Sequence, residues 1–309
     1  MINLSQKNVV QVANLTGFIK DNVEKVMRLA DILEFICSTQ WKDKLVLKGG
    51  TAINLFYRQL PRLSVDIDLD YIGQSKEEMG EDKERLWEFL QTSLYQKNYS
   101  LSPKRKRYFA LDSAVFQYVN NAGNRDNIKI EINYLDRNHI LPIKEMPLVT
   151  PVVQSDITIN VLDVCELYGS KLAALLGRCK PRDIYDVYGL EKDNIVSDMD
   201  MLRKCAIFYN CIAGEANIND VSSDILDGVT ERDINRQLKP VLKKSEKFNR
   251  SEVISELKEY LKELFALTEK EKLFVEKFNA KQYCPELLFE DEQILSRIAH
   301  HPMALWRMR

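Results

Sequence analysis

The segment Val65–Tyr71 alternates strictly between apolar and acidic residues, and this constrains the fold more than any other stretch of the chain. A period of two predicts a β-strand with one apolar face and one face of carboxylates. Asp66 and Asp68 then point the same way, with Cα atoms roughly 6.5–7 Å apart. Because Mg²⁺ favours a few carboxylates together with substrate phosphate oxygens, this strand predicts a site for hard divalent cations.

A glycine pair precedes this strand in the sequence. The apolar run at 45–47 ends at Gly49 and Gly50, which predicts a buried strand that closes in a tight turn. A helix is expected over 51–57, with Thr51 placed to cap it. The glycines let the backbone approach a ligand closely, and the amides and dipole at a helix start favour the phosphates of a nucleotide.

A third carboxylate is expected from a neighbouring strand over 128–135. Its alternation places the isoleucines on one face and Lys129, Glu131 and Asn133 on the other. Glu131 on that polar face would complete a two-metal site with the acidic pair. An ordinary solvent-facing glutamate explains the same position equally well, and both interpretations stay open.

The rest of the chain divides by periodicity. Helical and strand patterns mix in the first half, whereas the pattern is helical almost throughout after about residue 161. Pro181 is expected to open one of these later helices, and Thr268-x-x-Glu271 has the form of a capping box. We therefore expect an α+β protein: a mixed β-sheet with flanking helices in residues 1–190, and an all-helical domain in residues 191–309.

Composition narrows the possible partners and location. The 309 residues carry a net charge of −2, so the chain has no bulk attraction to nucleic acid, and any phosphate-binding surface must be local. The dense basic run at 104–107, flanked by aromatic residues, could bind RNA phosphates or form the solvated base of a hairpin. The absence of a secretory signal, of long apolar runs and of Cys-x-x-Cys pairs predicts a cytoplasmic protein with reduced thiols and no membrane partner.

Two blocks of sequence resemble the AbiEii/AbiGii-type nucleotidyltransferase toxins of the DNA polymerase β-like superfamily, whose relatives include the MenT toxins. The first block is Gly49-Gly50-Thr51-Ala52 followed by Arg62-x-Ser64-x-Asp66-Ile67-Asp68-Leu69. The second runs from Glu166 through Lys171-Leu172-x-Ala174-Leu175 and Arg178 to Arg182-Asp183-Ile184-Tyr185-Asp186. The resemblance extends over roughly residues 45 to 305 and implies the nucleotidyltransferase sheet with a helical C-terminal domain.

The activity implied by this resemblance is transfer of a nucleoside monophosphate from an NTP to an acceptor hydroxyl. For some members the acceptor is the 3′ end of tRNA. The implied setting is a toxin–antitoxin or abortive-infection system, with a cognate antitoxin as a possible partner and Mg²⁺, as two ions, as the cofactor.

The resemblance also implies residue roles. Catalysis would rest on Asp66, Asp68, Lys171 and Asp183, and the metal ions on Asp66, Asp68 and Glu131. Substrate binding would involve residues of both blocks: Gly49, Gly50, Thr51, Arg62, Ser64 and Lys171.

Other interpretations compete with these roles. Lys171 could be a surface lysine, Asp183 a helix-capping acid or a partner of a nearby arginine, and Asp70 the solvated end of its strand. The whole chain could be a catalytically inactive scaffold that binds a nucleotide or a protein. The acceptor could also be a protein or a small molecule instead of RNA.

Overall fold

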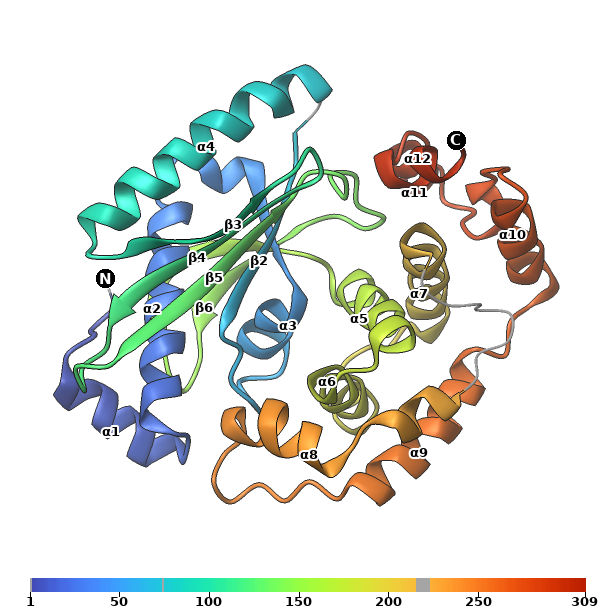
Figure 1. Cartoon of the computed structure of the whole chain (residues 1–309). Coiled ribbons are helices and arrows are strands. Elements are labelled where there is room, and N and C mark those ends of the chain that lie inside the picture. The colour runs from blue at the N-terminus through green and yellow to red at the C-terminus, as the bar shows by residue number, and fades with distance from the viewer. Residues whose placement is uncertain (1, 74, 215–222) are drawn as a thin grey trace. The chain divides into compact units, whose positions relative to one another are not determined.

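The computed structural model describes residues 2–73, 75–214 and 223–309 (Figure 1). The chain divides into two compact units. The first consists of residues 1–137, 143–161 and 241–245, and the second of residues 138–142, 162–240 and 246–309. The division into domains at residue 190 stays a prediction.

The first unit is built on a mixed β-sheet. Among the described residues it has seven strands in the order β3-β4-β5-β2-β1-β7-β6, and the pairs β1–β7 and β2–β5 are parallel. The strands are β1 (Leu45–Lys48), β2 (Asp66–Tyr71), β3 (Ser100–Arg107), β4 (Leu111–Val119), β5 (Arg125–Asn133), β6 (Lys144–Val149) and β7 (Gln154–Val161). The acidic strand β2 therefore lies inside the sheet, between β1 and β5, and not at an edge.

Helices cover the apolar face of this sheet. The long helices are α2 (Lys20–Cys37) and α4 (Lys76–Gln96), and α1 (Gln6–Thr16) packs on α2 (Figure 1). Tyr71 at the end of β2 donates a hydrogen bond to Asp82 of α4 at 2.6 Å, which fixes α4 on that face. The opposite face of β2 carries the aspartates, and the short helix α3 (Gly49–Ala52) continues directly into a wider helical turn over Ile53–Tyr57.

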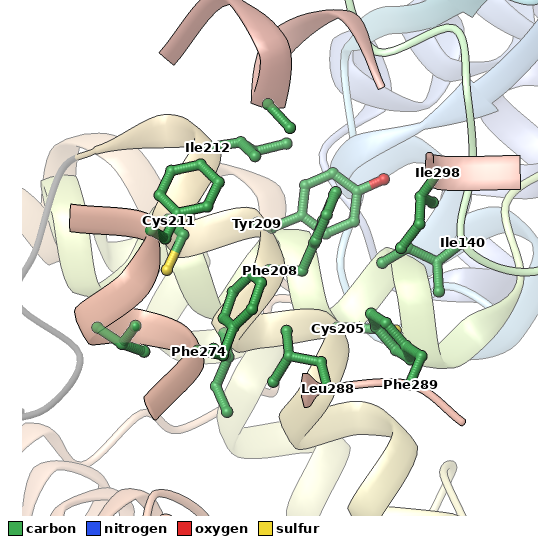
Figure 2. Close-up of a cluster of buried hydrophobic side chains, with 14 of the residues drawn as sticks. Ile140, Cys205, Phe208, Tyr209, Cys211, Ile212, Phe274, Leu288, Phe289 and Ile298 are labelled. Carbon is green, nitrogen blue, oxygen red and sulfur yellow. The ribbon is translucent and has the colours of Figure 1, made fainter. Parts of the chain in front are cut away.

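The second unit is helical in its described residues. Its helices are α5 (Val164–Arg178), α6 (Pro181–Lys192), α7 (Met199–Ala213), α8 (Glu231–Asp233), α9 (Arg250–Leu264), α10 (Glu269–Asn279), α11 (Glu292–Ile298) and α12 (Pro302–Arg307). Phe208 of α7 is completely buried, and its ring contacts four other rings in the core of this unit (Figure 2). With the sheet of the first unit, these helices confirm the predicted α+β class.

Local expectations had mixed outcomes. Pro181 is the first residue of α6, and Thr268 and Glu271 form the reciprocal capping box at the start of α10, both as predicted. The prediction that Thr51 caps its helix was wrong: the helix starts at Gly49, and Thr51 lies within its first turn. Among the described helices, none is long and apolar enough to cross a membrane.

Candidate active site

The Gly49–Gly50 turn lies directly against the acidic strand. Gly49 has φ +69°, a conformation that favours glycine, and a Cβ atom built there would lie 2.6 Å from Oδ2 of Asp68. A Cβ atom on Gly50 would lie 2.7 Å from Nη2 of Arg62 and 3.2 Å from Oγ of Ser64. Both glycines are therefore needed because the space that a side chain would fill is occupied by residues of the same sequence motif.

The polar residues behind this turn tie it to β2. Thr51 Oγ1 lies 3.0 Å from Ser64 Oγ and also donates to the backbone carbonyl of Asp66. Arg62 is 1% exposed and donates to the carbonyl of Leu63 at 2.9 Å. Because Thr51, Ser64 and Arg62 are buried, the structure places them as supports of the turn, while Gly49 and Gly50 are partly exposed.

The carboxylates of adjacent strands gather on one face of the sheet. Asp68 pairs in register with Glu131 of β5 and with Lys48 of β1, and Asp66 pairs with Lys129. Burial raises the pKa of Asp68, and the neighbouring carboxylates of Asp66 and Glu131 raise it further. The structure thus concentrates negative charge beside Gly49, and Lys129 offsets part of it through an ion pair with Glu131.

Asp70 does not behave as its position in the strand suggested. It is 1% exposed, and Lys48 Nζ lies 2.5 Å from its carboxylate and 3.3 Å from that of Asp136. The expectation of a solvated strand end was therefore wrong, because β1 and β5 flank Asp70 and Lys48 pairs with its carboxylate. Burial alone would lower the pKa of Lys48, but the two carboxylates outweigh it and raise that pKa.

The donor set fits a hard cation in part. Asp66 and Asp68 offer carboxylate oxygens on one strand face, the ligand type that Mg²⁺ prefers. Within residues 2–73, 75–214 and 223–309, however, no group of three His, Cys, Asp or Glu side chains converges as around a bound metal ion. Glu131 is instead paired with Lys129, so this third acid would join the other two only after leaving the ammonium.

The second sequence block forms a buried ion-pair cluster within the helical unit. Lys171 of α5 is 7% exposed and lies 3.0 Å from Asp183 and 3.2 Å from Asp186 of α6. Arg178 approaches Asp183 at 2.9 Å. Burial alone would raise the pKa of Asp183, but Lys171 and Arg178 outweigh it, and the pKa lies below its ordinary value. Lys171 is therefore not a surface lysine, and Asp183 pairs with both cations.

Glu166 is a further buried acid. It belongs to the second sequence block, but the resemblance assigns it no role. It is completely buried and accepts hydrogen bonds from Tyr209 at 2.6 Å and from the amides of Ile140 and Leu141, both at 2.9 Å. The ring of His139 lies 3.2 Å away. Glu166 thus fixes residues 138–142 within the helical unit. The signal that could have revealed this is an acidic residue inside an otherwise apolar helical stretch.

Comparisons with known proteins agree with this architecture. The fold and the acidic strand beside a glycine turn define the class as nucleotidyltransferase-like. The family model "Nucleotidyl transferase AbiEii toxin, Type IV TA system" matches residues 31–274, well over half of the chain. The chain therefore belongs to the AbiEii family of nucleotidyltransferase toxins.

A solved structure supports the same fold over the full length. MenT4, a nucleotidyltransferase toxin from Mycobacterium tuberculosis H37Rv, matches with a TM-score of 0.67 and 14% sequence identity. The match covers 99% of this chain and 100% of that chain. No protein in the search of curated sequences matches.

Proposed function

We propose that this family member is a Mg²⁺-dependent toxin that transfers a nucleoside monophosphate from an NTP to the 3′ end of tRNA. The observation that carries the proposal is the carboxylate of Asp68, packed against Gly49 with Asp66 and Glu131 beside it. The proposal includes a cognate antitoxin as partner. Because NTPs and tRNA are its substrates, the cytoplasm is the proposed location.

The residues of the first unit have separate roles in this proposal. The backbone at Gly49 and Gly50 receives the phosphates of the NTP, and Thr51, Ser64 and Arg62 hold that turn in place. Asp66 and Asp68 would hold Mg²⁺, as two ions if Glu131 joins them. Bound there, the metal would activate the acceptor hydroxyl and neutralise the leaving pyrophosphate. The hydroxyl attacks the α-phosphorus in line as pyrophosphate departs.

We infer a different role for the second block from the one that the resemblance implies. Lys171 is already bonded to two buried carboxylates, so it and Asp183 act as positioning residues that hold α5 against α6. Direct contact of Lys171 with the nucleotide stays a prediction from the family. A measured rise in KM for the NTP in a folded Lys171 variant would support that prediction over the positioning role.

One observation favours a second candidate function. The ion pair between Lys129 and Glu131 already neutralises the third acid, as expected in a catalytically inactive scaffold that binds a nucleotide or a protein. The two functions differ in whether a covalent product forms, and this difference can be measured directly.

The deciding experiment incubates the protein with each α-³²P-labelled NTP and Mg²⁺, with either total tRNA or total cell protein as acceptor. Label on tRNA that disappears with EDTA and in Asp66→Asn supports the proposal. Glu77→Gln, an exposed acid on α4, is the matched control and should transfer label normally. Label on protein would overturn the tRNA acceptor, and no label from folded wild-type protein would favour the scaffold.

A further inference from the structure

A groove of about 460 Å³ lies on the first unit's sheet, next to the proposed reaction site. Residues that line it include Lys104 and Lys106 of β3, Ser113 and Val115 of β4, and Lys129 and Glu131 of β5. The groove therefore begins at the proposed third metal ligand and extends to the edge strand of the sheet.

The strand register connects this groove to the acids. Asp68 pairs with Glu131, Glu131 pairs with Ser113, and Ser113 pairs with Lys106. Residues paired across adjacent strands share a face of the sheet, so these four form one row. At about 4.8 Å per strand the row spans roughly 14 Å from Asp68 to the edge. Gly49 lies at the acidic end of the row, because a Cβ atom built on it would lie 2.6 Å from Oδ2 of Asp68.

The charge of the groove is suited to a polyanion. Lys104 and Lys106 are exposed, and Lys129 adds a third ammonium beside Glu131. Val115 gives the groove an apolar floor, and Ser113 adds a hydroxyl. Because the whole chain has a net charge of −2, retention of a nucleic acid depends on a local cationic surface of this kind.

Arg105 of the basic run also lines the groove, whereas Arg107 at its end has a different role. Arg107 bonds to Glu84 at 2.9 Å and to Asp112 at 3.2 Å, and it lies over the ring of Trp87 on the face covered by α4. Arg107 is therefore structural. The turn that joins β3 to β4 carries two exposed rings, Tyr108 and Phe109, and Lys76 of α4 lies over the Phe109 ring.

We propose that this groove binds the sugar–phosphate backbone of a single-stranded acceptor RNA and directs its terminal hydroxyl toward Glu131. The inference rests on the proposed function, which places the NTP phosphates at the glycine turn. The acceptor then enters from the opposite end of the row, where the lysines of the edge strand β3 lie. Lys104 and Lys106 are positioning residues for the acceptor and do not bind the NTP.

The test uses charge reversal at the edge strand. Lys104→Glu/Lys106→Glu is compared with Lys7→Glu/Arg85→Glu, which makes the same charge change at exposed positions on α1 and α4. Both pairs are also introduced into full-length Asp66→Asn protein, so that binding is measured without turnover. The probe is a fluorescent single-stranded RNA with the sequence of a tRNA 3′ end, titrated at several salt concentrations.

We expect the groove variant to bind this RNA at least about tenfold more weakly. Its log Kd should depend less steeply on log salt concentration, by about 1.4, as for two lost phosphate contacts on a single strand. In the protein that keeps Asp66, the groove substitutions should raise the KM for RNA and leave the KM for the NTP unchanged. The control pair should match the parent protein in both the binding and the kinetic measurements.

Three results would overturn the proposal: unchanged RNA affinity and KM in the groove variant, a rise in the KM for the NTP instead, or no RNA binding by any variant. Unchanged RNA affinity and KM in the groove variant, with label still transferred to tRNA, would overturn the role of the groove but leave the proposed function intact. Groove-dependent binding without label transfer by the wild-type protein removes the proposed function but leaves the groove as an RNA-binding site.

Discussion

Gly49 meets two requirements that no other residue type satisfies together. Its φ of +69° is strained for a side-chain-bearing residue, and a Cβ atom would collide with Oδ2 of Asp68 at 2.6 Å. We predict that Gly49→Ala lowers the free energy of unfolding by about 1–3 kcal/mol and also reduces label transfer. Gly80→Ala is the control: Gly80 lies within α4 with nothing within 4 Å of its Cβ position. Chemical denaturation should show that this control is neutral or stabilising, and equal losses would contradict the explanation.

Lys171 compensates two buried carboxylates at once. Replacing it with methionine leaves Asp183 and Asp186 without its ammonium, and loss of one partner from a buried pair costs about 3–5 kcal/mol. We predict a loss of this size for Lys171→Met in urea denaturation.

A second substitution tests whether buried negative charge causes the loss of stability in Lys171→Met. Asp183 keeps Arg178 in the Lys171→Met variant, and the completely buried Asp186 loses the ammonium that lies 3.2 Å from its carboxylate. Adding Asp186→Asn should therefore recover part of the lost stability. If the double variant is less stable than Lys171→Met alone, the buried charge is not the cause of the loss.

At the scale of elements, Glu166 joins α5 to residues 138–142. Burial alone would raise the pKa of the Glu166 carboxyl, but hydrogen bonds from His139, Tyr209 and the Leu141 amide lower it below its ordinary value. The folded state therefore binds this proton less readily than the unfolded chain. The resulting stability is complete above the ordinary glutamate pKa of about 4.3 and is lost as pH falls through the lower folded value.

We predict that Glu166→Gln destabilises the protein by about 1–3 kcal/mol at neutral pH. The difference from wild type should shrink as the pH drops below about 4, because the wild-type carboxylate then becomes protonated. Glu259→Gln, at an exposed position on α9, should show neither effect. Denaturation series between pH 3 and pH 7 measure this, and a difference that stays constant with pH would contradict it.

Strands could be predicted where the local sequence alone shows the pattern of a strand. The apolar run at 45–47 and the alternating patterns at 65–71 and 128–135 are strong local signals, and the structure has β1, β2 and β5 there. Strands β3, β6 and β7 were not predicted. β3 and β6 are the edges of the sheet, carry charges and contain Pro103 and Pro147, which are tolerated only where ladder hydrogen bonds are not required.

The acidic strand and the glycine pair were predictable from the sequence, but the ion pairs around them were not. The alternation of β2 places Asp66 and Asp68 on one face, and the glycine pair indicates a close approach. That Asp70 is neutralised by Lys48, or Lys171 by two aspartates, depends on contacts between separate elements. No local pattern contains that information, so a lysine in a helix was as compatible with the surface as with the core.

For the molecule as a whole, each compact unit has its own buried core. Phe208 is completely buried among aromatic rings of the helical unit, and Phe→Ala at such a site costs about 3–5 kcal/mol. We predict that Phe208→Ala increases hydrogen exchange in α7 and α10, while amides of β1 and β2 stay protected. Phe109→Ala, at a position 58% exposed, should leave exchange unchanged in both units. Equal deprotection of helices and strands would instead mean that the two cores unfold as one cooperative system.

The bonds from Thr51 to Ser64 and Asp66, together with the packing of Arg62 on Gly50, hold the two ends of one sequence motif together. The peptide that joins them thus sets neither their separation nor their orientation. Extra residues inserted at the exposed Gln59 would lengthen the connecting segment without moving either end of the motif. A change in chain length near Gln59 is accordingly compatible with an unchanged arrangement of the glycines and the aspartates.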